Sequence, residues 1–172
     1  SNLFADQIIE ENGRKIYLVE ESDIYIRFYT GSYFLMDDGS FSIEEIIRGT
    51  KDSLFKSFTG KGFNTKKEIK YWGRVSLKST APRDQRNLYF AFPGPVNQIE
   101  LFKLDSNQVS VQKTGKYVPY PERSAFPPSP LKYHVFDCSI PRDSIVTFYY
   151  RITQFKGPLS ASRSHPYYYC KE

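Results

Sequence analysis

The sequence predicts an all-β fold, an antiparallel jelly-roll β-sandwich with one short helix in its N-terminal half. Aromatic residues make up 17% of the chain, with 14 Tyr and 14 Phe against one Met, and aromatic rings pack well on pleated sheets. Short apolar runs alternate with turn formers at a spacing typical of sandwiches and barrels. A crossover between residues 119 and 130 holds five of the 11 prolines, which favours a jelly roll over a meander.

The length of the chain fits one compact domain. Its 172 residues are 40% hydrophobic, which is enough to build a core. We therefore assign residues 1–172 to a single domain and expect residues 1–14 to be peripheral or poorly ordered. No run has the character of a signal peptide or a membrane span, so we expect a soluble protein or the soluble part of a larger one.

The first elements are two strands and a helix. Residues 16–19 and 24–29 are aromatic and β-branched runs separated by polar residues, a pattern that predicts a pair of strands. After a turn at residues 37–39, Ser42 and Glu45 match a capping box, and Gly49 suits a left-handed helix stop. The apolar residues between them share one side, so we expect this short helix to cover one end of a sheet.

Strand signals become regular after residue 62, with turn formers between them. Each run has the length and the aromatic or β-branched content of a strand in an antiparallel sandwich. The predicted strands are residues 71–77, 88–92, 98–104, 109–112, 133–138, 145–152 and 167–169.

The strand at residues 71–77 carries large side chains on both faces. Successive strand residues alternate between faces, which places Tyr71, Val75 and Leu77 together, and Trp72 with Arg74 opposite them. The first set predicts a core face. An indole beside a guanidinium predicts either a stacked structural pair or a polar recognition surface.

Two other strands repeat this arrangement of an apolar face and a face that mixes rings with charges. If the three strands share a sheet, the mixed faces join into one platform. Aromatic planes stack on pyranose rings, and guanidinium and carboxylate groups bind hydroxyls, so such a platform suits a sugar. The alternative is that the arginines pair with Glu100 and stack on the rings, which then only cover the sheet. The candidate residues are Trp72, Arg74, Glu100, Phe102, Tyr149 and Arg151.

The proline-rich crossover supplies a second candidate. It carries Tyr117, Tyr120, Glu122 and Arg123, and loops on a rigid scaffold commonly line binding sites. The alternative is that the prolines order the loop while Glu122 and Arg123 form a local pair that fixes its fold.

The chain has two cysteines, Cys138 and Cys170. The pair permits a disulfide, which would stabilise the fold by about 3 to 4 kcal/mol through closure of a long loop. The alternative is two separate thiols on different strands.

The charge pattern does not favour nucleic-acid binding. The net charge is +5, and the basic residues are scattered instead of lying along one face or arm. Attraction to acidic glycans or to an anionic membrane remains open.

Catalytic motifs are absent from the sequence, and we expect no enzyme, no cofactor and no metal. There is no GxSxG, HExxH, phosphate-binding glycine loop or dinucleotide fingerprint. His134 shares a strand face with Phe136, which favours a packed histidine over a general base. Asp37, Asp38 and Asp105 could supply calcium ligands, but Asx turns explain them better.

The order and spacing of several motifs indicate a family resemblance. From about residue 16 onward the chain resembles the second type of extracellular sensor domain of bacterial seven-transmembrane receptors with diverse intracellular signalling modules. It departs from that family at Gly73, in the strand at residues 133–140 and in its final aromatic stretch. The matching segments are 35–38 leading into 42–47, Phe58 before Gly60 and Gly62, 71–74, 88–93 with 97–102, 114–115 with 121–123, and 149–151.

The resemblance implies a jelly-roll sandwich similar to carbohydrate-binding modules, outside the cytoplasmic membrane. It also implies that the full protein continues into a transmembrane segment and a cytoplasmic signalling module. We therefore expect a non-enzymatic sensor that binds a carbohydrate-like ligand and pairs with a second copy, without nucleic acid. One alternative is a protein interaction or dimerisation module without a small ligand. Another is a sandwich-fold polysaccharide hydrolase or lyase, which needs two carboxylates at catalytic separation.

Overall fold

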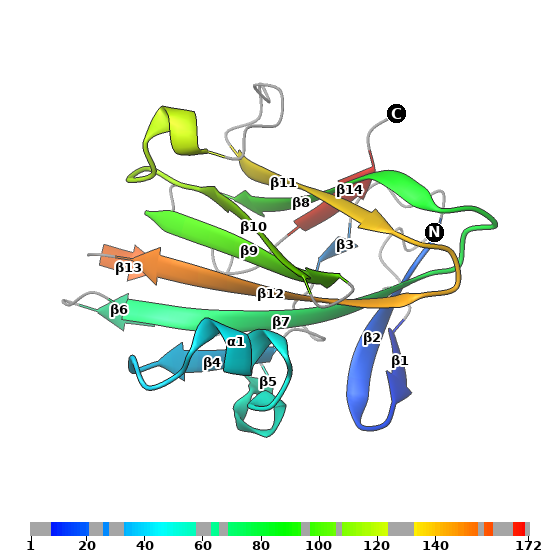
Figure 1. Ribbon diagram of the computed structural model, residues 1–172, viewed down its shortest axis with the longest axis horizontal. Coiled ribbons are helices and arrows are strands. Elements are labelled where there is room, and N and C mark those ends of the chain that lie inside the picture. The colour runs from blue at the N-terminus through cyan, green and yellow to red at the C-terminus, as the bar shows by residue number, and fades with distance from the viewer. Residues whose placement is uncertain are drawn as a thin grey trace.

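The computed structural model has the predicted all-β architecture, with β-sheets packed as a sandwich (Figure 1). The jelly-roll connectivity stays a prediction. The structure describes residues 8–20, 26–27, 33–57, 63–65, 69–93, 97–105, 108–123, 133–154, 157–159 and 167–170.

The larger sheet has the order β1 (Ile8–Glu11), β2 (Arg14–Val19), β7 (Ile69–Ser79), β12 (Ile145–Gln154), β9 (Gln98–Asp105) and β10 (Gln108–Thr114). Two strands lie off this path: β4 (Tyr33–Asp37) pairs with β7, and β5 (Lys56–Ser57) pairs with β4. β2 runs parallel to the last residues of β7, and β4 runs antiparallel to its first half. The long strand β7 therefore holds β2 and β4 one after the other along the same side.

The second sheet has the order β11 (Tyr133–Ile140), β8 (Gln85–Pro93), β14 (Tyr167–Cys170) and β3 (Ile26–Arg27). A separate short pairing joins β6 (Phe63–Thr65) to β13 (Gly157–Leu159), at the ends of β7 and β12 (Figure 1). The helical elements are α1 (Ile43–Ile47), η1 (Asp52–Leu54) and η2 (Tyr120–Glu122).

The main core lies between the two sheets. Strand alternation predicted the inward residues of β7, and the structure confirms them: Tyr71, Val75 and Leu77 are almost fully buried. β12 contributes alternate residues in the same way, and β11 closes the core from the second sheet. The remaining members of the cluster are Tyr17, Val19, Ile99, Leu101, Phe136, Ile140, Phe148, Tyr150 and Ile152.

The predicted helix is present, with the predicted signals at both ends. The backbone N–H of Glu45 donates to Ser42 Oγ, and the backbone N–H of Ser42 donates to Glu45 Oε2, which completes the capping box. The N–H of Ser42 and the nearby Lys51 ammonium lower the pKa of the Glu45 carboxyl. Gly49 follows with φ of 74°, the left-handed conformation that favours glycine at a helix stop. Ile46 and Ile47 are buried against the larger sheet.

Gly73 makes room for a tyrosine of the neighbouring strand. It lies directly opposite Tyr150 in the β7–β12 ladder. A Cβ atom at Gly73 would lie 1.9 Å from the Tyr150 ring carbon Cζ, so a bulkier residue requires the ring to move. Glycine at this position therefore has a packing reason, because the tyrosine ring occupies the space that a side chain would fill.

Most predicted strands appear with longer bounds, and some strands were not predicted. Strands β7 to β12 match, in order, the predictions at residues 71–77, 88–92, 98–104, 109–112, 133–138 and 145–152. Strand β14 matches the prediction at residues 167–169. Of the predicted strand at 24–29, only β3 lies within the described residues. Strands β1, β4, β5, β6 and β13 carry weaker period-two patterns, so sequence reasoning missed them. Residues 8–14, expected at the periphery, hold β1 at the end of the larger sheet and the turn into β2.

Candidate functional site

Strand register brings the six predicted face residues together in two adjacent rows. Arg151 on β12 lies opposite Trp72 on β7 and Glu100 on β9. Two residues along the strand, Tyr149 lies between Arg74 and Phe102 in the same way. The three strands therefore do share a sheet, with these side chains on one face, which was the condition for a common surface.

This face forms a second core and is not an open platform. The segment that contains α1 and η1 packs over it, in front of β4 and β7 (Figure 1). Trp72 is 0% exposed, Phe102 is 1% exposed and Tyr149 is 5% exposed. Because stacking on a sugar needs an accessible ring plane, these three aromatics do not offer a binding surface in this structure. The expectation of a concave sugar platform on this face is corrected, and its alternative, a cover for the sheet, describes the arrangement.

Trp72 is fixed by partners on both its polar and its apolar sides. Its indole Nε1–H donates to Asp37 Oδ2 over 2.9 Å, and its ring centroid lies 5.2 Å from that of Phe102. The Arg151 guanidinium lies over the Trp72 ring at 5.2 Å and donates from Nε to Glu100 Oε2 over 2.7 Å. A buried indole needs such an acceptor. The alternative in which the arginines pair with Glu100 holds for Arg151.

Arg74 pairs with Asp52 of η1, a residue that sequence reasoning did not select. Arg74 Nη1 lies 2.8 Å from Asp52 Oδ2, and Arg14 of β2 lies 2.9 Å from the same oxygen. The Tyr149 hydroxyl donates to Asp52 Oδ1 over 2.9 Å. No local motif marks Asp52, because its three partners come from distant parts of the chain.

Burial and charge both act on Tyr149. Desolvation, followed by the negative charge of Asp52, raises the pKa of its hydroxyl. The Arg74 guanidinium also lies over the Tyr33 ring at 4.6 Å and the Phe55 ring at 5.4 Å. A guanidinium paired with a carboxylate and enclosed by rings suits a structural role in a low-exposure site.

The second candidate site comprises residues 115–123 after β10, which we call the tyrosine loop. Its aromatic rings are exposed, whereas those of the covered face are buried. Tyr117 is 58% exposed and Tyr120 is 76% exposed. The Lys116 ammonium lies 5.7 Å from the Tyr117 ring centroid, and the Arg123 guanidinium lies 5.9 Å from that of Tyr120. The loop therefore presents two rings to solvent, each with a cation beside it.

Hydrogen bonds hold the tyrosine loop in place. The Tyr117 N–H donates to the Asn97 carbonyl, and Arg123 Nε donates to the Val118 carbonyl over 2.8 Å. Val118 is buried beneath the loop. At Gly115, where φ is 138°, an added Cβ would lie 2.4 Å from the Asn97 carbonyl oxygen, so only glycine fits that close approach. The loop is fixed by its backbone while its tyrosines remain accessible.

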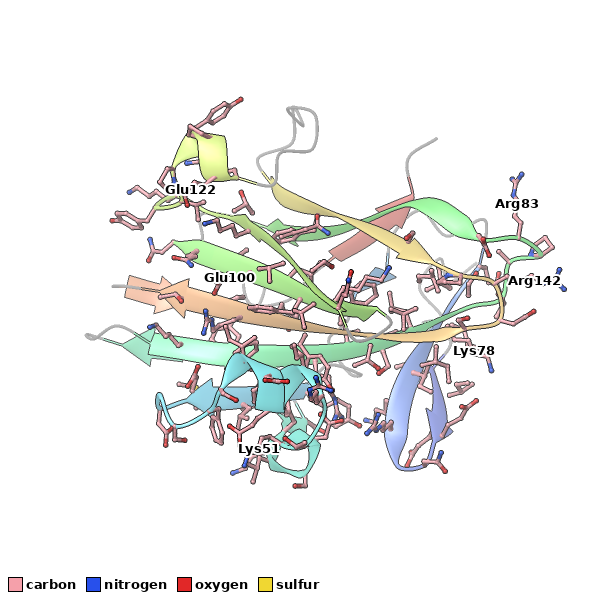
Figure 2. The ribbon with its side chains drawn as sticks, in the orientation of Figure 1. Lys51, Lys78, Arg83, Glu100, Glu122 and Arg142 are labelled. Atoms are coloured by element: carbon pink, nitrogen blue, oxygen red, sulfur yellow. The ribbon has the colours of Figure 1, made fainter. Side chains whose placement is uncertain are left out.

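Glu122 pairs with a strand residue and not with its sequence neighbour. Lys113 Nζ of β10 lies 2.6 Å from Glu122 Oε2, whereas the alternative interpretation of the sequence paired Glu122 with Arg123. Lys113 also lies opposite Glu100 in the β9–β10 ladder, and Glu100 and Glu122 lie toward the same end of the sheet (Figure 2). A row of alternating charge thus connects the loop to Arg151 at the covered face.

Cys138 and Cys170 lie on either side of β8. Both occupy the position opposite Leu88, Cys138 on β11 and Cys170 on β14. Two strand spacings separate their backbones, about 10 Å, whereas a disulfide needs Cα atoms no more than about 7 Å apart. This register corresponds to the alternative of two separate thiols.

The aspartates of the β4 turn act as Asx-turn acceptors. Asp37 Oδ1 accepts from the Gly39 N–H over 2.8 Å, and Asp38 Oδ1 accepts from the Ser40 N–H over 2.9 Å. Bonds from the Ser40 side chain and backbone lower the pKa of Asp38. Within the described ranges, no three His, Cys, Asp or Glu side chains group as metal ligands do. Within the same ranges, no helix is long and apolar enough to cross a membrane.

Comparison with known proteins gives one family. The family described as 7TMR-DISM extracellular 2 matches residues 29–162, a range that includes α1, the covered face and the tyrosine loop. No curated protein matches the chain at a significant level.

Proposed function

The chain belongs to the 7TMR-DISM extracellular 2 family, and we propose that it senses a carbohydrate-like ligand through the tyrosine loop. As a member, it is an extracellular sensor domain of a membrane-anchored receptor with transmembrane and intracellular modules, and it lies on the extracellular or periplasmic side. The ligand class and the position of the site are the proposal.

The exposure of Tyr117 and Tyr120 on a fixed loop is the observation that carries this proposal. Two accessible rings can stack on the apolar faces of pyranoses. Tyrosines on an ordered backbone lose little conformational entropy on binding, since each ring has only two side-chain torsions. The aromatics of the covered face offer no such access, which moves the expected site from β7, β9 and β12 to the end of β10.

Polar groups around the rings supply the contacts that sugar hydroxyls need. Lys113 and Glu122 form an ion pair at the base of the loop, with side chains 39% and 52% exposed. Lys116 is exposed and Arg123 is half-buried. A donor and an acceptor beside a stacking ring bind adjacent hydroxyls by charge-assisted hydrogen bonds. These cations also suit an acidic sugar, consistent with the net charge of +5.

The test combines a glycan array with thermal-shift measurements on the wild-type chain. A sugar that binds the folded state raises the melting temperature as its concentration exceeds the dissociation constant. Tyr117→Ala and Tyr120→Ala should each weaken binding of that sugar about fivefold or more, the loss typical of an aromatic anchor. Tyr120→Phe keeps the ring and should retain most of the affinity. Ile145→Ala, a change of an exposed apolar residue on β12, should leave the affinity unchanged.

Two results would contradict the proposal. The first is that no glycan, neutral or acidic, raises the melting temperature of the wild-type chain. The second is that a sugar binds, yet the Tyr117→Ala/Tyr120→Ala double variant retains full affinity, because the site then lies elsewhere on the domain.

We keep the absence of enzymatic activity as part of the proposal. The carboxylates nearest the proposed site are engaged, Glu100 by Arg151 and Glu122 by Lys113. A glycosidase uses two carboxyl groups that flank the scissile bond, whereas both of these carboxylates are already paired with cations. Incubation with a bound polysaccharide should leave its chain length unchanged.

A further inference from the structure

Arg123, at the end of the tyrosine loop, has no carboxylate partner among the residues that the structure describes. Its Nε donates to the Val118 carbonyl over 2.8 Å, and its guanidinium lies 5.9 Å from the Tyr120 ring centroid. Arg123 is therefore a cation that the fold positions without neutralising it. Other arginines in the described ranges do lie within salt-bridge distance of a carboxylate. These pairs are Arg14 and Arg74 with Asp52, Arg48 with Glu44, Arg142 with Asp143, and Arg151 with Glu100.

The bond to Val118 fixes the guanidinium of Arg123. Its terminal groups Nη1 and Nη2 have no partner in the described part of the chain, and they can bind a carboxylate end-on through two parallel N–H···O bonds. An arginine held in this way loses little side-chain entropy on binding. Its side chain is half-buried, and water screens a half-buried charge less than a fully exposed one. Arg123 thus has the geometry of an anion-binding arginine.

The other charges of the loop add to this preference for an anion. From residue 113 to residue 123 the chain has three cations and one carboxylate. That carboxylate, on Glu122, lies 2.6 Å from Lys113 Nζ, which neutralises it. Lys116 is exposed, lies beside the Tyr117 ring and has no carboxylate partner in the described ranges. Among the described residues of the loop, a ligand therefore meets two cations without acidic partners and no unpaired carboxylate.

We propose that the tyrosine loop selects a sugar that carries a carboxylate, that is, a uronic acid. The pyranose ring stacks on Tyr120, and the carboxylate binds Nη1 and Nη2 of Arg123. Tyr120 is 76% exposed, so Arg123 leaves most of its ring open for stacking. Lys116 contributes a second positive charge beside Tyr117. This selectivity rests on the proposed function of the loop as a carbohydrate site and adds the charge of the sugar.

The exposed rings and the small number of cations favour an acidic sugar over other anions. A free phosphate or a small carboxylic acid would engage the cations without covering Tyr117 and Tyr120. Recognition of anionic lipids typically uses about four to eight cations. Residues 113–123 have three, of which Lys113 is paired with Glu122. A uronic acid uses both the rings and the unpaired cations.

Isothermal titration calorimetry of the wild-type chain is the first test. The probes are short oligomers of galacturonate, glucuronate and mannuronate, each measured beside its methyl ester, which has the same rings without the charge. At least one free acid should bind about tenfold or more tightly than its ester, the gain expected from a charge-assisted bidentate pair. Added sodium chloride should weaken binding of that acid and leave binding of the ester nearly unchanged.

Substitutions in the loop locate the carboxylate. Arg123→Gln should bind the acid and its ester with similar affinity, because it lacks the guanidinium fork. The ratio of the two affinities is read within one variant, so a change in loop stability that affects both sugars cancels. Lys116→Gln, which leaves the bond between Arg123 and Val118 intact, should reduce the preference for the acid in part. Tyr120→Ala should weaken both forms by a similar factor, since it removes stacking and keeps the cations.

Arg142→Gln is the matched control. It changes the net charge as Arg123→Gln does, but Arg142 has a side chain that is 61% exposed and lies at the other end of the sheet from Glu122 (Figure 2). The preference for the acid should therefore stay as in wild type.

Equal affinity of the wild-type chain for every acid and its ester, with binding still lost in Tyr117→Ala/Tyr120→Ala, would overturn the carboxylate preference and leave the sugar site at the loop. A preference that Arg123→Gln retains in full, or that Arg142→Gln loses equally, would also overturn it. If no sugar binds the chain, the proposed function fails as well. Binding to anionic vesicles that Arg123→Gln abolishes, without binding to any uronate, would assign these cations to a membrane surface instead.

Discussion

Arg74 Nη1 lies 2.8 Å from Asp52 Oδ2, and this contact ties the central strand β7 to the η1 turn that follows helix α1. Both side chains are largely buried, at 7% and 12% exposure. The same carboxylate binds Arg14 of β2 and accepts from the Tyr149 hydroxyl of β12. One residue of the covering segment thus holds three strands of the larger sheet, and the Trp72 face is closed by this cluster as well as by apolar packing.

Asp52→Ala should destabilise the domain by about 3 kcal/mol, because removal of one partner leaves the buried Arg74 charge uncompensated. Urea unfolding followed by circular dichroism measures this loss. Asp143→Asn is the control, because asparagine tolerates the positive φ of 55° at this position. Asp143 pairs with Arg142 at 3.0 Å, but its side chain is 75% exposed, so the loss should stay below about 0.5 kcal/mol. Equal losses in the two variants would contradict the structural role of Asp52.

Gly73→Ala should destabilise the domain by about 2 kcal/mol or more, since the added methyl group overlaps the Tyr150 ring. The double variant Gly73→Ala/Tyr150→Leu should lose less than the sum of the two single losses, because a smaller partner relieves the overlap. Chemical denaturation of the four proteins measures this coupling. If the losses of unfolding free energy in the two single variants add up to the loss in the double variant, the Cβ atom at residue 73 does not meet the Tyr150 ring.

The stability of the domain should fall at alkaline pH, in part through Tyr149. The folded state raises the pKa of this hydroxyl above its ordinary value of 10.0, so above pH 10 the unfolded chain loses a proton that the folded chain retains. The contribution of Tyr149 to the free energy of unfolding is therefore fully present below pH 10 and declines as the pH rises through the raised pKa. Tyr149→Phe should make the fall in melting temperature above pH 10 less steep. Tyr120→Phe, at an exposed ring, should leave the slope as in wild type.

Trp72 is the only tryptophan and reports on the covered face. Because its indole is 0% exposed, acrylamide should quench its fluorescence weakly in the folded domain and strongly after unfolding. A sugar bound at the tyrosine loop should leave this weak quenching unchanged. Strong quenching of the folded protein, or a large increase when a sugar is added, would show that the segment over Trp72 opens.

The elements that the sequence predicted well depend on short-range physics. The alternation of β7 and β12 follows from strand geometry, and the capping box at Ser42 closes within three residues. The pairing of Arg151 with Glu100 belongs to one of the two alternatives that the sequence left open, in which the arginines pair with Glu100. The missed strands are short, so they carry too few residues for a clear period.

By itself, the sequence determined the all-β class, the single helix and the two faces of the central strands. Only the tertiary structure decided that both faces of these strands are buried. The alternation of side chains between the two faces of a strand predicts that Trp72, Phe102 and Tyr149 share a side. Their burial, however, depends on residues 43–55 folding over strands that come later in the chain. The tertiary structure likewise set Asp52 against its distant partners. Accessibility of a face is a long-range property, because it depends on which other segment packs there, and no local pattern specifies that segment.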